Sequence, residues 1–224
     1  SDAVRYNSKS RIDGAYNYKS CELNCLSCQH GKQPSLVFVD VTNRCNLDCP
    51  ICINNTPSMG FVFDPPKEYF QKIFEHVGKL DPKPSLQLFG GEPTVRRDLF
   101  DLILAARKQG LPTRVVTNGL KLADEDYARE MVRLRATVML AYDGDNPETY
   151  KLMRNSEKSL ELKLKALENL SKAEGAKVTL MTLVAKGFND HELPEMLQLC
   201  HKYRRIIRAI YLMPLAHMWD QNEF

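Results

Sequence analysis

The sequence lacks the features that mark several special classes of protein. No stretch approaches the roughly 20 consecutive apolar residues that span a bilayer, and the start, SDAVRYNSKSR, is too polar for a secretory signal. The formal net charge is only +3, so nothing points to the concentrated basic surface that nucleic acid requires. Hydrophobic residues make up 43% and charged residues 26% of the 224 positions, which excludes disorder. We therefore expect a globular cytoplasmic protein with no nucleic-acid partner and no transmembrane segment.

Cysteine departs from this average composition. Six of the seven cysteines lie between Cys21 and Cys52, and the other is Cys200. An odd number of cysteines without an export signal argues against a disulfide framework, because thiols stay reduced in the cytosol. The clustering therefore predicts metal or iron–sulfur ligation. Cys200 lies on the apolar side of an expected helix, where we expect it to pack in the core.

Short β-branched runs alternate with amphipathic stretches of helical length after residue 34. The runs predict six strands, at Leu36–Val41, Ser85–Phe89, Thr113–Thr117, Thr137–Tyr142, Lys177–Val184 and Ile206–Met213. Five helices are expected between them, at Lys67–Lys79, Arg97–Gln109, Asp124–Leu134, Leu160–Glu174 and His191–Tyr203. This alternation predicts an α/β fold with a parallel sheet, either an open doubly wound sheet or a partial barrel.

Residues at the expected helix ends agree with this assignment. Asp124 and Asp190 are predicted to cap helix N-termini, and Gly110 and Gly175 stand where a helix needs a left-handed residue. A boundary near Pro34 divides the chain into a cysteine-rich arm, 1–34, and an α/β core, 35–224. The first residue is Ser and not Met, so we expect further sequence beyond the ends, with the core truncated at its C-terminus.

Three cysteines follow the first expected strand in the run VTNRCNLDCPIC. Cys45, Cys49 and Cys52 have C-x3-C-x2-C spacing. Loops after the strands of a parallel α/β protein form its active face. Three thiolates in one such loop can bind three corners of a [4Fe–4S] cube and leave the fourth iron open to another ligand. The pattern therefore predicts a catalytic cluster site.

A second loop, GGEPT, follows the second expected strand. Gly90 and Gly91 are predicted to let the backbone approach a ligand closely and to expose its N–H groups, while Glu92 offers a carboxylate to an amine. Because neighbouring parallel strands end at the same edge of a sheet, one ligand can touch both the open iron and this loop.

Together these two motifs resemble those of radical S-adenosylmethionine (SAM) enzymes. The resemblance implies a partial (βα)6, TIM-like barrel that follows the short cysteine-rich arm, with a [4Fe–4S] cluster on the three cysteines of the first loop. It implies that SAM chelates the open iron. The implied cofactor contacts in the second loop are Gly90, Gly91, Glu92 and Pro93. It also implies an electron donor such as ferredoxin or flavodoxin.

Later strand ends fit the same family. Thr117-Asn118-Gly119 and Tyr142-Asp143-Gly144 resemble its third and fourth strand-end signatures, so Asn118 and Asp143 are implied contacts of the ribose or methionine of SAM. Asn189, in KGFND, resembles a position that faces the cofactor. Ile51 is a departure, because many members carry an aromatic residue there, beside adenine. No residue is assigned as a catalytic acid, base or nucleophile.

The arm repeats the cysteine spacing with Cys21, Cys25 and Cys28. Together with the CPIC form, this resembles a branch that includes archaeal tetraether-lipid synthases, in which an auxiliary iron–sulfur cluster accompanies the catalytic one. The fourth ligand stays open between His30, Cys200, a substrate and a residue outside the chain. The branch implies a lipid alkyl chain as substrate, and peptide or small-molecule modification is the alternative. An apolar cavity is expected for a lipid, lined by Met181, Leu183 and Met213.

A structural zinc site is the main alternative for the cysteines. The pairs Cys25-x2-Cys28 and Cys49-x2-Cys52 match a four-cysteine zinc pattern, which would make the chain a binding module without turnover. That alternative leaves the other cysteines and the GGEP loop unexplained. The sequence therefore predicts a radical SAM enzyme that cleaves SAM reductively to a 5′-deoxyadenosyl radical, which abstracts hydrogen from an unactivated C–H bond.

Overall fold

The computed structural model describes residues 34–54 and 59–215 of the chain. Nearly all of them belong to the unit Leu36–Phe224. The three cysteines of the arm, Cys21, Cys25 and Cys28, lie outside the described residues, as does His30. The auxiliary cluster and the boundary near Pro34 therefore stay predictions.

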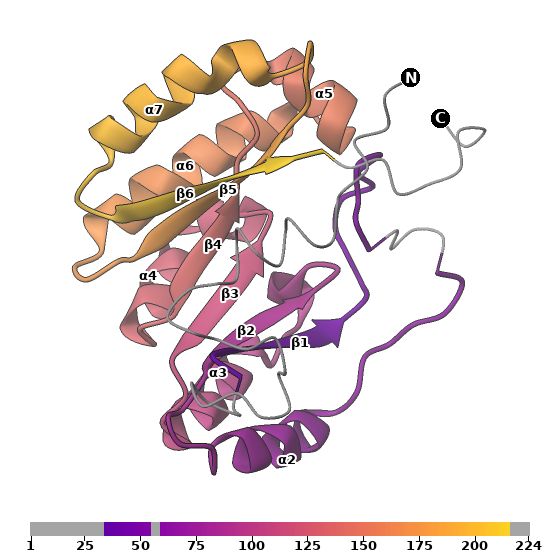
Figure 1. Ribbon diagram of the computed structural model, residues 1–224, viewed down its shortest axis with the longest axis vertical. Helices are drawn as coiled ribbons and strands as arrows, with labels where there is room; N and C mark the ends of the chain where they lie inside the picture. The colour runs from indigo at the N-terminus through magenta and orange to yellow at the C-terminus, as the bar shows by residue number, and fades with distance from the viewer. Residues whose placement is uncertain (1–33, 55–58, 216–224) are drawn as a thin grey trace, which may run out of the picture. The chain divides into compact units, whose positions relative to one another are not determined.

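Six parallel strands form one sheet in which chain order is also spatial order (Figure 1). They are β1 Leu36–Thr42, β2 Ser85–Gly90, β3 Thr113–Thr117, β4 Thr137–Ala141, β5 Val178–Val184 and β6 Ile207–Pro214. Since β1 and β6 are the two edges of this sheet, it is an unclosed, partial barrel. The predicted α/β fold with six strands is confirmed.

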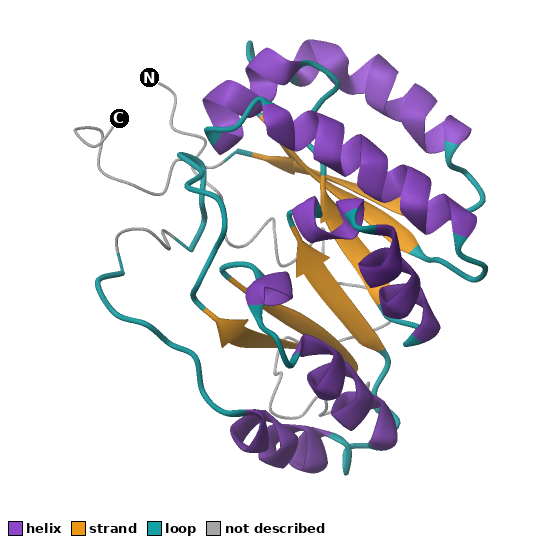
Figure 2. Ribbon diagram, turned by 180° about the vertical axis from the view of Figure 1, so that it is seen from behind, coloured by secondary structure: helices purple, strands orange, loops and turns teal. Residues whose placement is uncertain are grey.

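The helices cover one face of the sheet, as the views from the front and from behind show (Figures 1 and 2). They are α2 Lys67–Val77, α3 Leu99–Lys108, α4 Glu125–Arg133, α5 Pro147–Arg154, α6 Lys158–Lys172 and α7 Leu193–Lys202, with short 3₁₀ turns η2 Pro93–Val95, η3 Leu120–Ala123 and η4 Asp190–Glu192. None of these described helices has the length and apolar character needed to cross a membrane.

The sequence prediction missed α5. Pro147 occupies its first turn, and the side chain of Asn146 caps it by accepting a hydrogen bond from the Glu148 N–H at 3.0 Å. These signals were present, but eight residues are too few to show helical periodicity clearly.

The two predicted N-terminal caps differ in the structure. Asp124 caps α4 as predicted, because its side chain accepts from the Tyr127 N–H at 3.0 Å. The prediction for Asp190 is wrong: this residue lies in η4, its carboxylate accepts from the Gly187 N–H, and α7 begins only at Leu193. A 3₁₀ turn thus intervenes where the sequence favoured a direct helix start.

Strand residues alternate between the two faces of the sheet. The face under the helices holds the core, with residues such as Val39, Leu88, Val115, Leu140 and Leu180 buried there. The opposite face, here called the inner face, carries the residues between them. On β5 and β6 these are Met181, Leu183, Tyr211 and Met213, with Met181 paired to Tyr211 and Leu183 paired to Met213.

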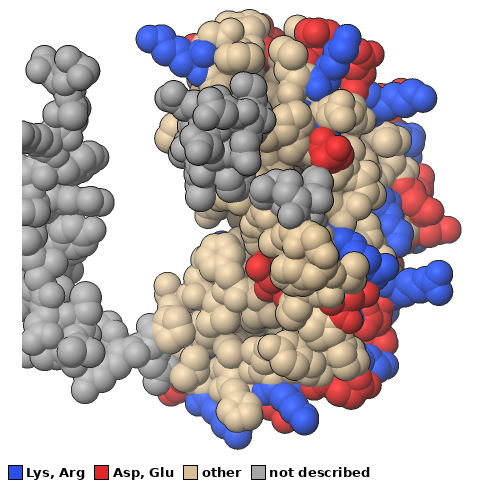
Figure 3. Space-filling model, turned by 90° about the vertical axis from the view of Figure 1, so that its right-hand side faces the viewer, with Lys and Arg blue, Asp and Glu red and all other residues tan. Residues whose placement is uncertain are grey.

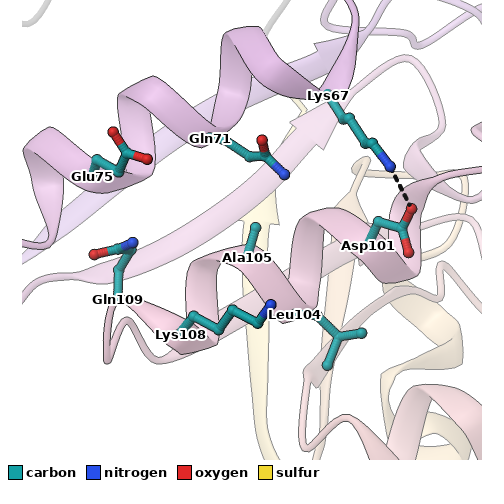
Figure 4. A pocket seen from close by; sticks show the side chains of 8 residues that line it. All are labelled: Lys67, Gln71, Glu75, Asp101, Leu104, Ala105, Lys108 and Gln109. Atoms are coloured by element: carbon teal, nitrogen blue, oxygen red, sulfur yellow. Dashed lines mark hydrogen bonds and ion pairs between the residues drawn. The ribbon is translucent and has the colours of Figure 1, made fainter.

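The helical layer holds a cavity of its own. About 370 Å³ in volume, it lies between α2 and α3, where Lys67 pairs with Asp101 at 3.2 Å (Figure 4). Its other lining residues are Gln71, Glu75, Leu104, Ala105, Lys108 and Gln109. No strand-end residue lines it, so it is separate from the loops that follow the strands.

Candidate functional site

The cysteine loop, residues 43–54, begins where β1 ends. Its three thiols, of Cys45, Cys49 and Cys52, are partly buried and lie within electrostatic reach of one another. The Cys52 N–H donates to the Cys49 carbonyl at 3.1 Å and closes a turn. The Leu47 N–H points at the Cys45 sulfur at 3.4 Å. Such N–H groups stabilise negative charge on a ligating sulfur.

Backbone hydrogen bonds join the cysteine loop to the GGEP loop. The Gly91 N–H donates to the Thr42 carbonyl at 2.7 Å, and the Glu92 N–H donates to the Arg44 carbonyl at 2.8 Å. A Cβ atom on Gly90 would collide with the Thr42 carbonyl oxygen, and one on Gly91 with that of Arg44. The Gly91 N–H is therefore bonded within the protein and not exposed to a ligand as the sequence predicted. The two glycines admit the backbone of the neighbouring loop.

Glu92 connects the GGEP loop to the end of β3. Its side chain is buried, at 1% exposure. Oε1 accepts from the Thr94 N–H at 3.0 Å, the Thr94 hydroxyl at 2.6 Å and the Thr117 hydroxyl at 2.7 Å, and Oε2 accepts from the Asn118 N–H at 2.7 Å. All four donors are uncharged. Pro93, also buried, starts η2 directly after this carboxylate.

Asn118 links the end of β3 to the cysteine loop. Its Nδ2 donates to Oδ1 of Asn46 at 2.7 Å, and its Oδ1 accepts from the Leu120 N–H at 3.0 Å. The structure thus brings three of the predicted elements together at one edge of the sheet: the cysteine loop, the GGEP loop and the β3 end.

Asp143 and Arg154 form a buried ion pair beside the cysteines. The Asp143 side chain is fully buried and also accepts from the Leu183 N–H at 3.2 Å. Burial alone would raise the pKa of Asp143, but the charge and hydrogen bonds of Arg154 outweigh it and hold that pKa low. Arg154 also makes a side-chain hydrogen bond to Cys49. A fixed positive charge therefore stands next to one predicted cluster ligand.

Asn189 hydrogen-bonds to the backbone of Asp143. It is fully buried, its Nδ2 donates to the Asp143 carbonyl at 2.6 Å and the Leu183 carbonyl at 2.8 Å, and its Oδ1 accepts from the Ala185 N–H at 2.8 Å. These bonds engage both ends of its amide within the protein. The structure gives it a bracing position between the ends of β4 and β5, where the family resemblance implied a position facing the cofactor.

Sequence reasoning missed two buried cations. Arg96 follows the GGEP loop, and its Nη1 donates to the Val41 carbonyl at 2.8 Å while its Nη2 pairs with Asp98 at 2.8 Å. Lys163 is fully buried in α6. No local pattern distinguishes either residue from a solvated basic side chain, since only the tertiary arrangement buries them.

The donor set fits an iron–sulfur cluster. Three thiols stand in one loop, with a backbone N–H directed at Cys45 and a guanidinium at Cys49, and such outer contacts tune and orient ligating sulfurs. Burial raises the pKa of the Cys45 thiol to about 11 and also raises that of Cys49, so ligation has to displace protons. Within residues 34–54 and 59–215, no three His, Cys, Asp or Glu side chains are placed to hold a single metal ion. Cys200 packs against the core from α7, as predicted.

A second cavity, of about 290 Å³, opens beside the two loops. It is lined by Asp40, Thr42, Asn43, Asn54, Met59, Phe61, Phe63, Gly90 and Gly91. The residues predicted to line an apolar cavity for a lipid, Met181, Leu183 and Met213, are absent from this lining. They lie together on the inner face instead.

Comparison with known proteins places the chain in one family. The Radical SAM superfamily profile matches residues 39–200. The 7,8-dihydro-6-hydroxymethylpterin dimethyltransferase of Methanocaldococcus jannaschii is 32% identical over 219 residues, covering 96% of this chain and 43% of that protein. The GTP 3′,8-cyclase of Petrotoga mobilis is 30% identical over 201 residues, covering 84% of this chain and 58% of that protein.

Solved structures agree at the level of the fold. Streptococcus suis SuiB bound to S-adenosylmethionine superposes with a TM-score of 0.66 and 16% identity, over 83% of this chain and 41% of that one. The chain spans about half the length of the curated relatives it matches. The family match, the 32% identical relative and the shared partial barrel lead to one conclusion: the chain belongs to the radical SAM superfamily.

Proposed function

We propose that the chain carries the cluster and SAM site of a radical SAM enzyme, with Cys45, Cys49 and Cys52 as the ligands of a [4Fe–4S] cluster. The observation that carries this proposal is that the three thiols lie in a strand-end loop hydrogen-bonded to the GGEP loop. When bound, the cluster and SAM supply a 5′-deoxyadenosyl radical by one-electron cleavage of the C5′–S bond, and this radical takes hydrogen from an unactivated C–H bond.

The residues of the chain bind and orient these groups. Arg154 places positive charge beside Cys49 and favours its thiolate form. Oε2 of Glu92 accepts one hydrogen bond, from Asn118, and a carboxylate oxygen can accept a further one. We assign that capacity to the amino group of SAM. Asn118 and Asp143, at adjacent strand ends, are proposed as the edge of the site that holds the rest of the cofactor.

The inner face supports a lipid alkyl chain as one substrate. Met181, Leu183 and Met213 are partly buried and lie side by side there. Figure 3 shows a hollow on this side whose visible walls are mostly uncharged, while Lys, Arg, Asp and Glu gather over the helices. An apolar wall next to the site favours a substrate without charge at its reacting carbon.

A small molecule is the second candidate substrate, and a different observation favours it. The dimethyltransferase that is 32% identical over 96% of this chain acts, by its name, on a pterin. A planar heterocycle modified at carbon is therefore proposed as the alternative to a lipid chain. Modification of a peptide is a third outcome that the experiment has to separate.

Anaerobic reconstitution tests the proposal. Protein loaded with iron and sulfide should be brown, bind SAM and release 5′-deoxyadenosine on reduction. Cys45→Ala should abolish this release, while Cys200→Ala, which removes a thiol from the core side of α7, should keep it. Colourless protein with one firmly bound zinc per chain and no cleavage product would overturn the proposal.

The substrate is tested with the full-length protein. Lipid vesicles, a reduced pterin and a peptide are each incubated with SAM and reductant, and the products are analysed by mass spectrometry. The substrate is the one whose modification rises in step with 5′-deoxyadenosine. Release of 5′-deoxyadenosine without any change in the lipid would discard the lipid and leave the enzyme class standing.

A further inference from the structure

Lys163 is a buried cation that the proposed chemistry does not use. It lies in α6, its side chain is fully buried, and its Nζ donates to the carbonyl of Asn118 at 2.6 Å and to that of Ala141 at 2.7 Å. These carbonyls belong to the ends of β3 and β4, the two neighbouring strands that carry Asn118 and Asp143. A single side chain thus ties together two strand ends of the site.

On the β3 side, Lys163 completes the fixation of Asn118. The N–H of Asn118 is held by Glu92, its carbonyl by Lys163, and its side-chain amide by Asn46 of the cysteine loop. Each polar part of Asn118 therefore has a partner on a different element. Removing the ammonium would release one of the hydrogen bonds that hold Asn118, the residue that links both loops.

On the β4 side, the bond to Ala141 lies two residues before Asp143. Asp143 in turn holds Arg154, which reaches Cys49. The ring of Tyr150, from α5, also faces the Lys163 ammonium at 5.7 Å. Lys163 is therefore connected to the cysteine loop by two independent routes, one through Asn118 and one through Asp143.

The positive charge of Lys163 explains why an apolar residue at position 163 would not hold the two strand ends equally well. Glu92 is buried with four uncharged donors, and the Lys163 ammonium supplies positive charge from the far side of Asn118. A buried ammonium is strongly unfavourable unless its hydrogen bonds and a counter-charge compensate. Both compensations are present here, and both come from residues of the site.

We propose that Lys163 is a positioning residue that fixes the cysteine loop relative to the GGEP loop, and that it thereby sets the affinity for SAM without touching SAM or the cluster. This inference rests on the proposed function. The placement of the two loops can also be measured in the chain without cofactor. The role of Lys163 and the proposed radical SAM function can therefore fail separately.

The first test uses hydrogen exchange in the chain without cofactor. Lys163→Met keeps the length of the side chain and removes its charge and donors. Lys165→Met is the matched control, because Lys165 lies on the same helix, is about half exposed and pairs with Glu168. Peptides covering 43–50 and 117–120 should exchange about tenfold faster in Lys163→Met and be unchanged in the control. Equal exchange in both variants would overturn the inference.

The second test uses the reconstituted full chain. At equal iron content, Lys163→Met should bind SAM about tenfold more weakly than the wild type, with a smaller SAM-induced change in the electron paramagnetic resonance spectrum of the reduced cluster. A lower melting temperature with unchanged SAM affinity and spectrum would show a merely structural role and overturn the inference.

The role of Lys163 can still be tested if the variant does not fold or if the wild type takes up no cluster. If Lys163→Met does not fold, Lys163→Gln, which keeps two N–H donors without the charge, is compared with Lys165→Gln in the same way. If the wild-type chain takes up no cluster, the proposed function fails, while the exchange rates still show whether Lys163 fixes the two loops.

Discussion

Arg154 holds both carboxylate oxygens of Asp143, with Nε 2.7 Å from Oδ2 and Nη2 2.9 Å from Oδ1. The carboxylate comes from the loop after β4 and the guanidinium from the last residue of α5. Because the same guanidinium contacts Cys49, the ion pair couples the fold of the β4 end to the predicted cluster loop. Loss of either partner would leave the other charged and buried.

Asp143→Asn tests this coupling. The variant keeps the shape of the side chain but leaves Arg154 without its counter-charge, so we expect the free energy of unfolding to fall by about 3–5 kcal/mol. Glu125→Gln is the control, since its pair with Lys172 is about half exposed and is worth about 0–1 kcal/mol. Chemical denaturation of the chain without cofactor measures both. Equal small losses would show that the buried pair is not required for stability.

Glu92 gives a second test, sharper than the sequence alone allowed. The sequence implied only a contact with the amino group of SAM, whereas the structure adds four protein donors. Glu92→Gln, which keeps one acceptor oxygen and the size, should retain the cluster iron and bind SAM about tenfold more weakly. Glu92→Ala should lose iron as well, because its buried donors lose their acceptor. Glu161→Gln, exposed on α6, is the control. Unchanged SAM affinity in Glu92→Gln would contradict the assigned role.

The fold could be predicted because its signals are local. Each of the six strands is a short run rich in Val, Ile, Leu, Phe or Thr, and five of the helices are long enough to show periodicity. The η4 turn at Asp190 was misassigned and the short α5 was missed, since one or two turns of helix leave little periodic pattern. The motif residues of the site could be located from spacing and strand order, which place Cys45 and Glu92 at neighbouring strand ends.

The interior of the site could not be predicted in the same way. Lys163 and Asn189 are buried by contacts with elements tens of residues away in the chain, such as Asn118 and Asp143. Their sequence neighbours are ordinary for a helix surface and a loop. The geometry also changed the expectation for Gly91, because the close approach that it permits involves the backbone of the cysteine loop, at Asn43 and Arg44.

Gly91→Ala measures that close approach. A Cβ atom at this position would collide with the carbonyl oxygen of Arg44, so the cysteine loop would have to move away. We expect a loss of about 1–3 kcal/mol in stability, as for other overpacked sites, together with poor iron uptake. Gly175→Ala is the control, because its Cβ would meet open space and only its φ of +85° is strained. It should lose about 1 kcal/mol and take up iron normally. Normal iron uptake by Gly91→Ala would contradict the tight contact between the loops.

The pH dependence of stability reports on Lys163. Burial, and after it the positive charge of Arg154, lower its pKa to about 8, against the opposing effect of Asp143, Cys49 and Glu92. Between that pH and about 10.5, the unfolded chain binds a proton that the folded chain has released, so stability should rise with pH in this window. Below about pH 8 the full penalty of burying the ammonium remains. The difference between wild type and Lys163→Met, measured by denaturation without cofactor at pH 7.5 and 10, isolates this contribution from other titrating groups. A difference that is constant with pH would contradict it.

The arm cysteines lead to a prediction about iron content. Cys21, Cys25 and Cys28 have the same C-x3-C-x2-C spacing as the cysteine loop, and three thiolates can hold a [4Fe–4S] cluster while its fourth iron takes another ligand. Anaerobically reconstituted full-length protein should therefore contain about eight iron atoms per chain, and replacing the three arm cysteines by Ala should leave about four. Replacing Cys45, Cys49 and Cys52 should leave the other four and abolish SAM cleavage, so the two triplets can be assigned independently.

His30→Ala and Cys200→Ala then test two candidates for the fourth ligand, because loss of a ligand should lower only the arm's share of the iron. About four iron atoms in the wild type, unchanged when the arm cysteines are replaced, would show that the arm holds no cluster.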